Sequence, residues 1–286
     1  MIVFERRACA ILYNLLRSRG DARPFLMPVN ICSDVPRTFI AAQQPVDLVD
    51  IDAETLSIDS KQCLARVRAE PQRYAGIVYV RTYGSERDPT SFFDELREIR
   101  SDLFIIDDKC LCRPDWSGEH RSSAADVTLF STGHAKYLDL DGGGFAQLRD
   151  GVDYRRQPPA MNDWFDLRPP ETSWEEYRGR IADMVPIVDA HKRALNAIYA
   201  EALPAAIQLP AEFHQWRFNI RVPDPERLRS AAFEEGLFLS RHYEPLAPGF
   251  PIAAKLHSEI VNLFNDRYFD EARARRMAEL TLRHLR

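Results

Sequence analysis

Short apolar runs alternate with segments of helical periodicity along the first half of the chain. The runs hold four to six residues and are rich in β-branched side chains, which is typical of strands buried on both faces of a sheet. The intervening segments repeat apolar residues three and four positions apart, as amphipathic helices do. The predicted strands cover 24–28, 46–51, 77–80, 103–106, 127–130 and 145–148. The predicted helices cover 8–16 (closed by Gly20), 35–43, 59–70 and 89–100.

This alternation predicts an α/β fold with a mainly parallel sheet. Parallel strands need a crossover long enough to return to the same edge, and each helical segment supplies one. From 151 to 172 the periodicity stops, and proline, aspartate and arginine predominate. We expect a surface excursion or linker there.

The last third of the chain has a different order of elements. A long helix is expected over 174–203, interrupted near Pro186. It is followed by a strand over 215–222, a helix over 225–236, a strand at 237–239 and a helix over 269–285. We therefore predict a large domain over 1–172, and the long helix with a small α+β domain over 173–286.

Composition narrows the classes of function. The 286 residues are 45% hydrophobic and 28% charged, an ordinary balance for a globular protein. A net charge of −5 argues against a nucleic-acid binder, which needs a surplus of lysine and arginine. No apolar stretch approaches the roughly 18 residues of a membrane span, and the N-terminus does not resemble a signal peptide. We expect a soluble cytoplasmic protein that acts on small molecules, with no nucleic-acid or membrane partner.

The five cysteines change this picture little. Their odd number and irregular spacing do not indicate a disulfide framework. Cys110 and Cys112 form a C-x-C pair, but no second pair or ligand cluster accompanies it. We therefore expect reduced thiols and no metal site.

The side chains most suited to catalysis or binding follow the ends of two predicted strands. Asp107 and Asp108 end one strand, and Ser131 ends the next. Lys136 follows Ser131 by five residues and precedes a triple glycine at 142–144. In open α/β sheets, ligands bind at the carboxyl ends of the strands, so these side chains are expected to share one edge.

Each of these features alone has a simpler explanation. A strand-end acid is usually a cap or a solvated turn, a lone lysine usually lies on the surface, and triple glycine often marks a tight turn. Together, however, acid, hydroxyl and lysine in this order are the set that pyridoxal 5'-phosphate (PLP) requires. Lys136 would form the Schiff base with the aldehyde, Asp108 would keep the pyridine nitrogen protonated, and Ser131 would bind the phosphate.

The same passages resemble a known family. IIDDKCL and FSTGHAK, followed by DGGG, are similar to the "hydrophobic-E-D-A-A-Q" and "F-S-F-x-x-x-K" motifs and Gly-Gly turn of the DegT/DnrJ/EryC1/StrS family of PLP-dependent sugar aminotransferases. The segments 45–59, 83–88 and 240–246 resemble its "P-V-x-x-D-I-D-x-E-T-L-x-I-D", "Y-G-x-x-x-D" and "H-Y-x-P-L" motifs, in the same order.

This resemblance implies a fold, a cofactor and roles for individual residues. It implies fold-type I architecture and a homodimer with sites at the subunit interface. It makes Lys136 the Schiff-base lysine and proton shuttle, Asp108 the partner of the pyridine nitrogen, and Ser131 a phosphate ligand. Asp107 takes the place of the family's neighbouring glutamate and is expected to be structural.

The chain departs from the family pattern around the cofactor. The family's phosphate-binding "S-G-T/R" is replaced by a charged stretch in which Arg6 or Arg7 could bind the phosphate by a charged fork, or which could simply be a solvated N-terminus. Cys32 and Asn30 lie where a ring-stacking aromatic is expected, and both are poor stackers. Leu111 replaces the glutamine of the acid motif, and no "G-Y-N-x-R" segment is present.

Four further residues are candidate substrate ligands, each with a structural alternative. His134 could approach the phosphate or substrate, or be a hydrogen-bonded structural histidine. His242 and Tyr243 could border the mouth of the site, or pack within a loop. Arg81 could bind the carboxylate of the amino donor, or pair with a neighbouring acid.

The favoured function is therefore transfer of an amino group from an amino-acid donor to a keto sugar or related keto metabolite. Two alternatives stay open. The same scaffold could catalyse another PLP reaction, such as elimination or dehydration, because the cofactor supports both. The altered phosphate motif would also suit a degenerate subunit that binds a ligand or partner without turnover.

Overall fold

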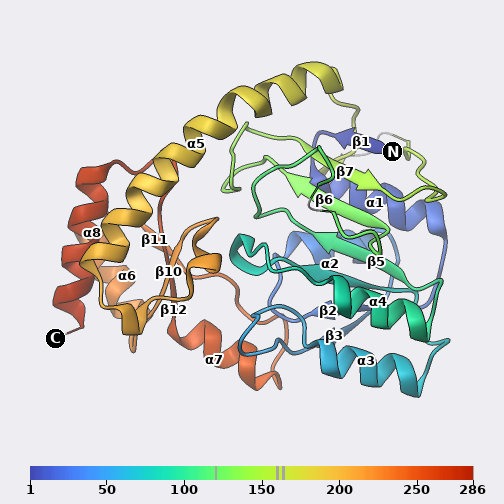
Figure 1. Ribbon diagram of the computed structural model, residues 1–286, viewed down its shortest axis with the longest axis horizontal. Helices are drawn as coiled ribbons and strands as arrows, with labels where there is room; N and C mark the ends of the chain where they lie inside the picture. The colour runs from blue at the N-terminus through green and yellow to red at the C-terminus, as the bar shows by residue number, and fades with distance from the viewer. Residues whose placement is uncertain (120, 159–160, 163–164, 286) are drawn as a thin grey trace.

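A seven-stranded sheet forms the larger part of the molecule (Figure 1). The structure is a computed structural model that describes residues 1–119, 121–158, 161–162 and 165–285. The strand order is β1-β7-β6-β5-β4-β2-β3, with β2 to β6 parallel and β7 antiparallel to both β6 and β1. The strands are β1 (Ile2–Glu5), β2 (Phe25–Pro28), β3 (Val46–Val49), β4 (Gly76–Val80), β5 (Phe104–Asp108), β6 (Val127–Ser131) and β7 (Gly144–Leu148).

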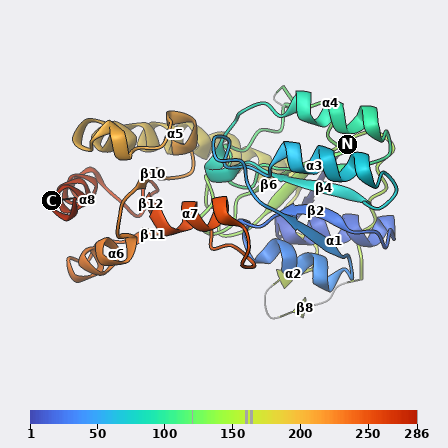
Figure 2. The same cartoon turned by 90° about the horizontal axis from the view of Figure 1, so that it is seen from below.

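Four helices cover the two faces of this sheet (Figure 2). α1 (Ala8–Arg19) and α2 (Asp34–Ala41) pack on one face, and α3 (Ser60–Ala69) and α4 (Thr90–Ile99) on the other. α1 ends where the sequence predicts, at Gly20, whose φ of 62° allows its amide to bond the carbonyl of Leu16. The predicted α/β class with a mainly parallel sheet is confirmed.

The N-terminal residues are more ordered than the sequence suggests. Residues 2–5 form β1, an edge strand that pairs with β7 from Ile2–Gln147 to Glu5–Gly144. Glu5 is buried and accepts hydrogen bonds from Tyr154 Oη at 2.7 Å and Arg156 Nε at 2.6 Å. This strand was not predicted from the sequence, and the groups that bury the Glu5 carboxylate come from a loop about 150 residues away.

The predicted excursion at 151–172 contains one short hairpin. β8 (Met161–Asn162) pairs with β9 (Phe165–Asp166), while 159–160 and 163–164 lie outside the described residues. No other helix or strand occurs in its described part.

One long helix joins the two parts of the molecule, and the expected interruption in it is wrong. α5 (Trp174–Ala202) begins at a capping box in which Ser173 and Glu176 bond each other's backbone amides. It continues through Pro186 because that residue lies on the exposed side, where water can solvate the carbonyl freed by the missing amide. Both ends of the helix are anchored by packing, since its first half contacts the large sheet and its second half the small one.

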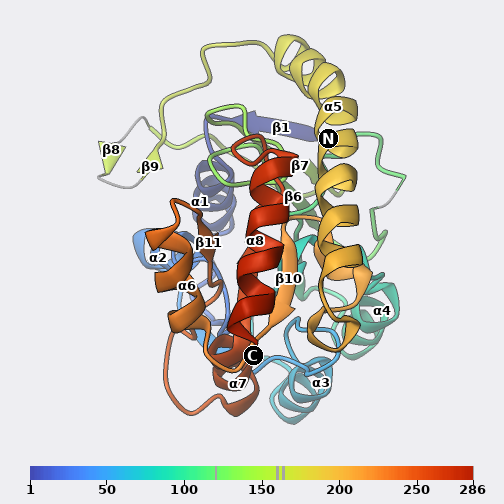
Figure 3. The same cartoon turned by 90° about the vertical axis from the view of Figure 1, so that its left-hand side faces the viewer.

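A three-stranded antiparallel sheet forms the smaller part (Figure 3). Its order is β10 (Phe218–Arg221), β12 (Ile260–Leu263), β11 (Leu239–Ser240), and α6 (Pro225–Glu234) and α8 (Glu271–His284) pack against it. The sequence interpretation omitted its central strand β12 and the preceding α7 (Pro251–Glu259). The nine residues of α7 and the four of β12 follow each other without an intervening turn signal, and each is too short for a clear periodicity.

The two parts are held together by α7 and by a shared apolar cluster. The Asp50 carboxylate, just beyond β3, accepts the amides of Ile252 and Ala253 at 3.0 Å and so caps the N-terminus of α7. The cluster includes Tyr83, Trp216 and Leu256. Across the described ranges, no helix is both long and apolar enough to cross a membrane.

Candidate active site

A cavity of about 350 Å³ lies at the carboxyl edge of β4, β5 and β6, under residues of the smaller part. Parallel strands deliver their C-terminal side chains to this edge, as the sequence suggested. All nine site residues predicted from the sequence line it: Arg7, Cys32, Arg81, Asp108, Ser131, His134, Lys136, His242 and Tyr243. The fold therefore brings together candidates up to 236 positions apart in the chain.

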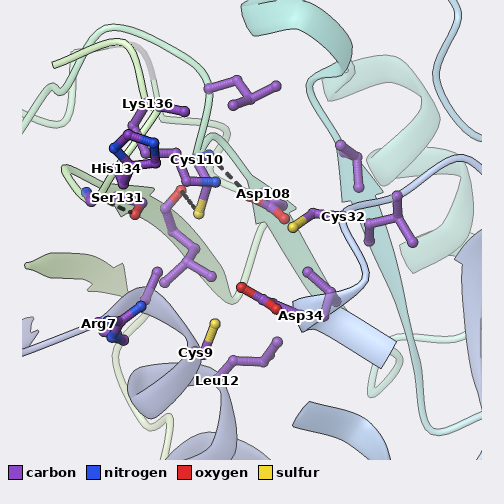
Figure 4. Close-up of a pocket in the computed structure, with 18 of the residues that line it drawn as sticks. Arg7, Cys9, Leu12, Cys32, Asp34, Asp108, Cys110, Ser131, His134 and Lys136 are labelled. Carbon is purple, nitrogen blue, oxygen red and sulfur yellow. Dashed lines mark hydrogen bonds between the residues drawn. The ribbon is translucent and has the colours of Figure 1, made fainter. Parts of the chain in front are cut away.

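Asp108 and Lys136 reach the cavity from neighbouring parts of the sheet, the end of β5 and the loop after the adjacent strand β6. Asp108 is the last residue of β5, is 6% exposed, and accepts the amide of Cys110 at 2.9 Å. Lys136 lies in the loop between β6 and β7, is half-buried, and points into the same space (Figure 4). An acid and an amine are thus held close enough for each to shift the pKa of the other.

The surroundings decide the charge of both groups. Burial raises the pKa of the Asp108 carboxyl above its usual value, against the opposing effects of the Cys110 hydrogen bonds and of Lys136. Burial alone would lower the pKa of Lys136, but Cys110, Cys32 and Asp108 oppose it, and the pKa lies above its ordinary value. Lys136 is therefore an ammonium at neutral pH, and a group that withdraws its proton must act before it becomes a nucleophile.

One end of the cavity is suited to an anion. The N-terminus of α1 opens onto it with Arg7 at the N-cap, and within the described residues the Arg7 side chain forms no ion pair or hydrogen bond. Ser131 lies opposite, and its hydroxyl accepts the amide of Gly133. A helix N-terminus, a free guanidinium and a hydroxyl together are typical of phosphate binding.

The triple glycine makes this end possible. A Cβ at Gly144 would lie 2.4 Å from the backbone nitrogen of Ala8, and one at Gly143 would lie 2.6 Å from the Tyr177 ring. Gly143 also adopts a φ of 92°, and its amide bonds the carbonyl of Arg6 at 2.6 Å. Glycine therefore lets the β6–β7 loop approach the start of α1 closely.

Three thiols and a second carboxylate face the same space. The side chains of Cys9, Cys32, Cys110 and Asp34 point into the cavity (Figure 4). Burial raises the pKa of Cys9 to about 12 and that of Cys110 well above its usual value. Both are therefore neutral thiols at neutral pH. They line the cavity as weakly polar side chains and are not nucleophiles.

Arg81 reaches the cavity wall with its guanidinium already paired. Nε and Nη2 donate to the two carboxylate oxygens of Asp107 at 2.6 and 2.8 Å, and a third nitrogen donates to the carbonyl of Arg87. The ion pair is buried, and it raises the pKa of Arg81 although burial alone would lower it. This is the salt bridge that the sequence offered as the alternative to substrate binding, and it gives Asp107 the structural position expected of it.

The wall opposite the sheet is aromatic. The Trp216 ring lies edge-on to His242 with centroids 5.1 Å apart, and Tyr243 is parallel to Tyr83 at 6.4 Å. Burial, with Arg217 and Lys136 nearby, lowers the pKa of His242 to about 4, so its imidazole is neutral. Its Nδ1 is buried without a hydrogen-bond partner in the described part of the chain. His134 differs, since its side chain is 85% exposed and lies 3.5 Å from Asp139.

Asp34, Asp141 and Trp216 are among the cavity residues that were not predicted as site residues. Asp34 lies in the first turn of α2, six residues beyond the end of β2, so its place at the carboxyl edge of the sheet depends on the β2–α2 loop. Asp141 lies beside the glycine cluster. Trp216 precedes β10 and has no local signal, because only the packing of the smaller part places it over Lys136.

Comparison with known proteins identifies the fold. No protein-family model and no curated protein sequence matches the chain. Solved structures do match: a putative sugar aminotransferase from Streptococcus pneumoniae in its PLP form is 15% identical, with a TM-score of 0.78 over 100% of this chain and 88% of that one.

Two further structures agree with it. An aminotransferase of the DegT/DnrJ/EryC1/StrS type from Brucella abortus is 18% identical, with a TM-score of 0.74 over 99% of this chain and 86% of that one. A 3-amino-5-hydroxybenzoic acid synthase is 17% identical, with a TM-score of 0.72 over 98% and 85% of the two chains. At the level of the fold the family resemblance is confirmed, and this chain has the fold-type I architecture of the PLP-dependent DegT/DnrJ/EryC1/StrS aminotransferases.

Proposed function

We propose that this chain is a PLP-dependent aminotransferase that moves an amino group from an amino-acid donor to a keto sugar or a related keto metabolite. The observation that carries the proposal is the pairing of Lys136 with Asp108 in one cavity, beside an anion-binding helix terminus. An amine, an acid and a phosphate cradle are the three groups by which a protein holds PLP.

The donor set fits the cofactor. Lys136 would attach it covalently and afterwards carry the proton that moves during amino transfer. Asp108 would hold a proton on the pyridine nitrogen, and the carboxylate form that this requires would be favoured by the positive ring. Ser131, Arg7 and the first amides of α1 would bind the phosphate. When bound, PLP supplies the electron sink that stabilises a substrate carbanion.

The aromatic wall is the proposed substrate side. His242 and Tyr243 face Lys136 across the cavity, and the neutral imidazole can accept or donate a hydrogen bond to a polar substrate. A secondary role is proposed for His134 at the solvent boundary. Arg81 would act mainly by fixing the wall next to Asp108, because Asp107 occupies its guanidinium.

Three proposals concern the whole protein. The family resemblance supports a homodimer, which light scattering would measure directly. We also retain a cytoplasmic location and the domain division at 172/173. Packing supports that division only in part, because Tyr177 and Ile181 at the start of α5 belong to a cluster with Phe130 and Phe145 of the large sheet.

An absorbance titration tests the cofactor role. Purified wild-type protein and Lys136→Ala would be titrated with PLP, then reduced with borohydride and digested for mass spectrometry. We expect a visible band in the wild type only, with the reduced cofactor attached to the peptide that contains Lys136. A wild type without a band at saturating PLP would overturn the proposal in favour of the non-catalytic alternative.

A second step separates transamination from other PLP chemistry. Amino acids would be added singly to the loaded wild type, and the loss of the visible band followed together with the release of the keto acid. Conversion by at least one donor is expected. A stable band with every donor, combined with turnover of a hydroxylated substrate without an amino donor, would favour elimination.

A further inference from the structure

A lysine interrupts the apolar stripe of α5. The buried residues of this helix repeat with helical spacing, and all but Lys192 are aliphatic or aromatic; they are Tyr177, Ile181, Val185, Lys192, Leu195, Ile198 and Tyr199. Lys192 is only 3% exposed. Burying an ammonium costs free energy unless its three hydrogens find partners, so its contacts require an explanation.

Neutral groups from three segments surround the Lys192 amine. Nζ donates to the carbonyl of Trp216 at 2.7 Å and to Oδ1 of Asn265 at 2.9 Å, and it lies 5.0 Å from the centroid of the Tyr137 ring. No carboxylate in the described part of the chain lies within ion-pair distance of it. Its contacts therefore join α5, the segment before β10, the segment after β12 and the loop that carries Lys136.

Two of these contacts lead directly to Lys136. The indole nitrogen of Trp216 donates to the carbonyl of Ala135 at 2.6 Å, immediately before Lys136. The hydroxyl of Tyr137, immediately after it, donates to Oδ1 of Asp189 at 2.6 Å, one turn before Lys192 on α5. Lys136 is thus held between two residues that both contact Lys192.

The backbone at this point needs such support. Ala135 has a φ of 58°, a left-handed conformation that a residue with a Cβ adopts only when its surroundings enforce it. The Trp216 hydrogen bond to its carbonyl supplies one constraint, and Lys192 in turn holds the Trp216 carbonyl.

We propose that Lys192 is a positioning residue, which fixes the amine of Lys136 inside the cavity by holding Trp216 and Tyr137 on either side of it. The proposal gives the smaller part of the molecule a defined role at the reactive lysine. It rests on the proposed function only in taking Lys136 as the reactive group, and its test is carried out on protein without cofactor.

The test measures how Lys136 reacts with a small amine reagent. Wild type, Lys192→Met and Trp216→Phe would be labelled with limiting acetic anhydride from pH 6 to 10, and the modification of Lys136 quantified by mass spectrometry. Lys255→Met on α7 is the matched control, because Lys255 is exposed and its ion pair is with the neighbouring Glu259 on the same helix. We expect labelling of Lys136 to rise about threefold or more in the first two variants, as the loop opens more often, and to stay unchanged in the control.

Two comparisons make the result decisive. Because Lys192 acts partly through Trp216, the double variant Lys192→Met with Trp216→Phe should raise Lys136 labelling by less than the product of the two single effects. A Lys192→Met protein with a lowered melting temperature but an unchanged Lys136 labelling profile would reduce Lys192 to a structural residue and overturn the proposal. If Lys192→Met does not fold, Trp216→Phe and Tyr137→Phe still test whether the residues on either side of Lys136 hold it in place. Lys136 labelling at the wild-type rate in both variants would overturn the proposal.

Failure of this proposal and failure of the proposed function give different results. A wild type that does not bind PLP removes the aminotransferase function, but leaves the labelling of Lys136 as a valid measure of its position. A wild type that binds PLP, with Lys136 labelling insensitive to Lys192 and Trp216, removes only the positioning role.

Discussion

The cavity around Lys136 and the junction around Lys192 place the same side chain in two environments. Lys136 lies beside Asp108 and the thiols of Cys110 and Cys32, which oppose the effect of burial and raise its pKa. Lys192 lies among a carbonyl, an amide oxygen and an aromatic face, and burial lowers its pKa to about 7. The pKa of a buried lysine is therefore set by burial together with the ionisable groups around it, and these groups differ between the two sites.

The two lysines also differ in what their surroundings leave free. Nζ of Lys192 donates to oxygens from two segments, whereas Lys136 opens onto about 350 Å³ of cavity. The contacts of Lys192 suit a side chain that holds segments together, whereas the open space beside Lys136 suits a side chain that reacts with a bound molecule.

The largest effect is expected from Asp108→Asn, which removes the acid from the cavity. Turnover should fall by about 10²-fold or more, the range found when a positioned charge or proton partner is lost. The pKa of Lys136 should also fall, because burial is no longer opposed by that carboxylate. Measurements are the steady-state rate and the pH profile of Lys136 labelling. Asp34→Asn is the matched control, and an equal fall of the Lys136 pKa in it would contradict the assignment to Asp108.

Arg7→Ala should weaken the binding of PLP by about 10- to 100-fold, the value of one or two charge-assisted hydrogen bonds. Pyridoxal, which has no phosphate, should bind equally to the variant and the wild type. Arg6→Ala is the control, because Arg6 instead pairs with Glu171 and Asp166. Equal losses for PLP and pyridoxal, or the same loss in Arg6→Ala, would show that Arg7 does not bind the phosphate.

Lys192→Met should flatten the dependence of stability on pH in the alkaline range. The pKa of Lys192 is about 7 in the folded state, whereas the ordinary pKa of a lysine, which applies to the unfolded chain, is 10.5. The unfolded chain therefore binds more protons between these two values. Wild-type stability should gain up to about 1.4 kcal/mol per pH unit from this group as the pH rises through that window.

That pH dependence has several possible sources nearby. Asp189 on α5, Asp266 after β12 and Arg217 before β10 also influence Lys192, and Tyr137 packs on its amine. Urea unfolding from pH 7 to 10 of wild type, Lys192→Met and the exposed control Lys255→Met isolates the lysine. Identical slopes in all three proteins would contradict the pKa assigned to Lys192.

The smallest effect is expected from Cys32→Phe, which places an aromatic ring where the cavity has a thiol. Stacking should tighten PLP by about 0.5–1.5 kcal/mol, or roughly 2- to 12-fold. Cys32→Ala is the control, since it removes the thiol without adding a ring. Titration of absorbance against PLP measures both, and weaker binding by Cys32→Phe than by Cys32→Ala would show that the site has no room for a stacked ring.

The sequence was most informative where local pattern and local chemistry agree. The strands of the parallel sheet, helix α1 with Gly20, and the positions of Asp108, Ser131 and Lys136 at one edge all follow from apolar runs and the residues that end them. These features depend on neighbours in the chain, so their signals survive without knowledge of the fold.

Other features have no local signal. β12 has only four residues and follows α7 without a turn signal, α5 continues through Pro186 because that side faces water, and β1 is ordered only by pairing with β7. Lys192 interrupts an apolar stripe in the sequence, but the sequence does not show which groups it contacts.

By itself, then, the sequence determined the α/β class and the chemical identity of the groups at the carboxyl edge of the sheet, because both depend on residue type and short spacing. Only the tertiary structure decided that Arg81 is paired with Asp107, that Trp216 and His242 close the cavity, and that Lys192 supports Lys136 from behind. Those contacts join residues 24 to more than 100 positions apart, and contacts at such separations are fixed by packing rather than by local preference.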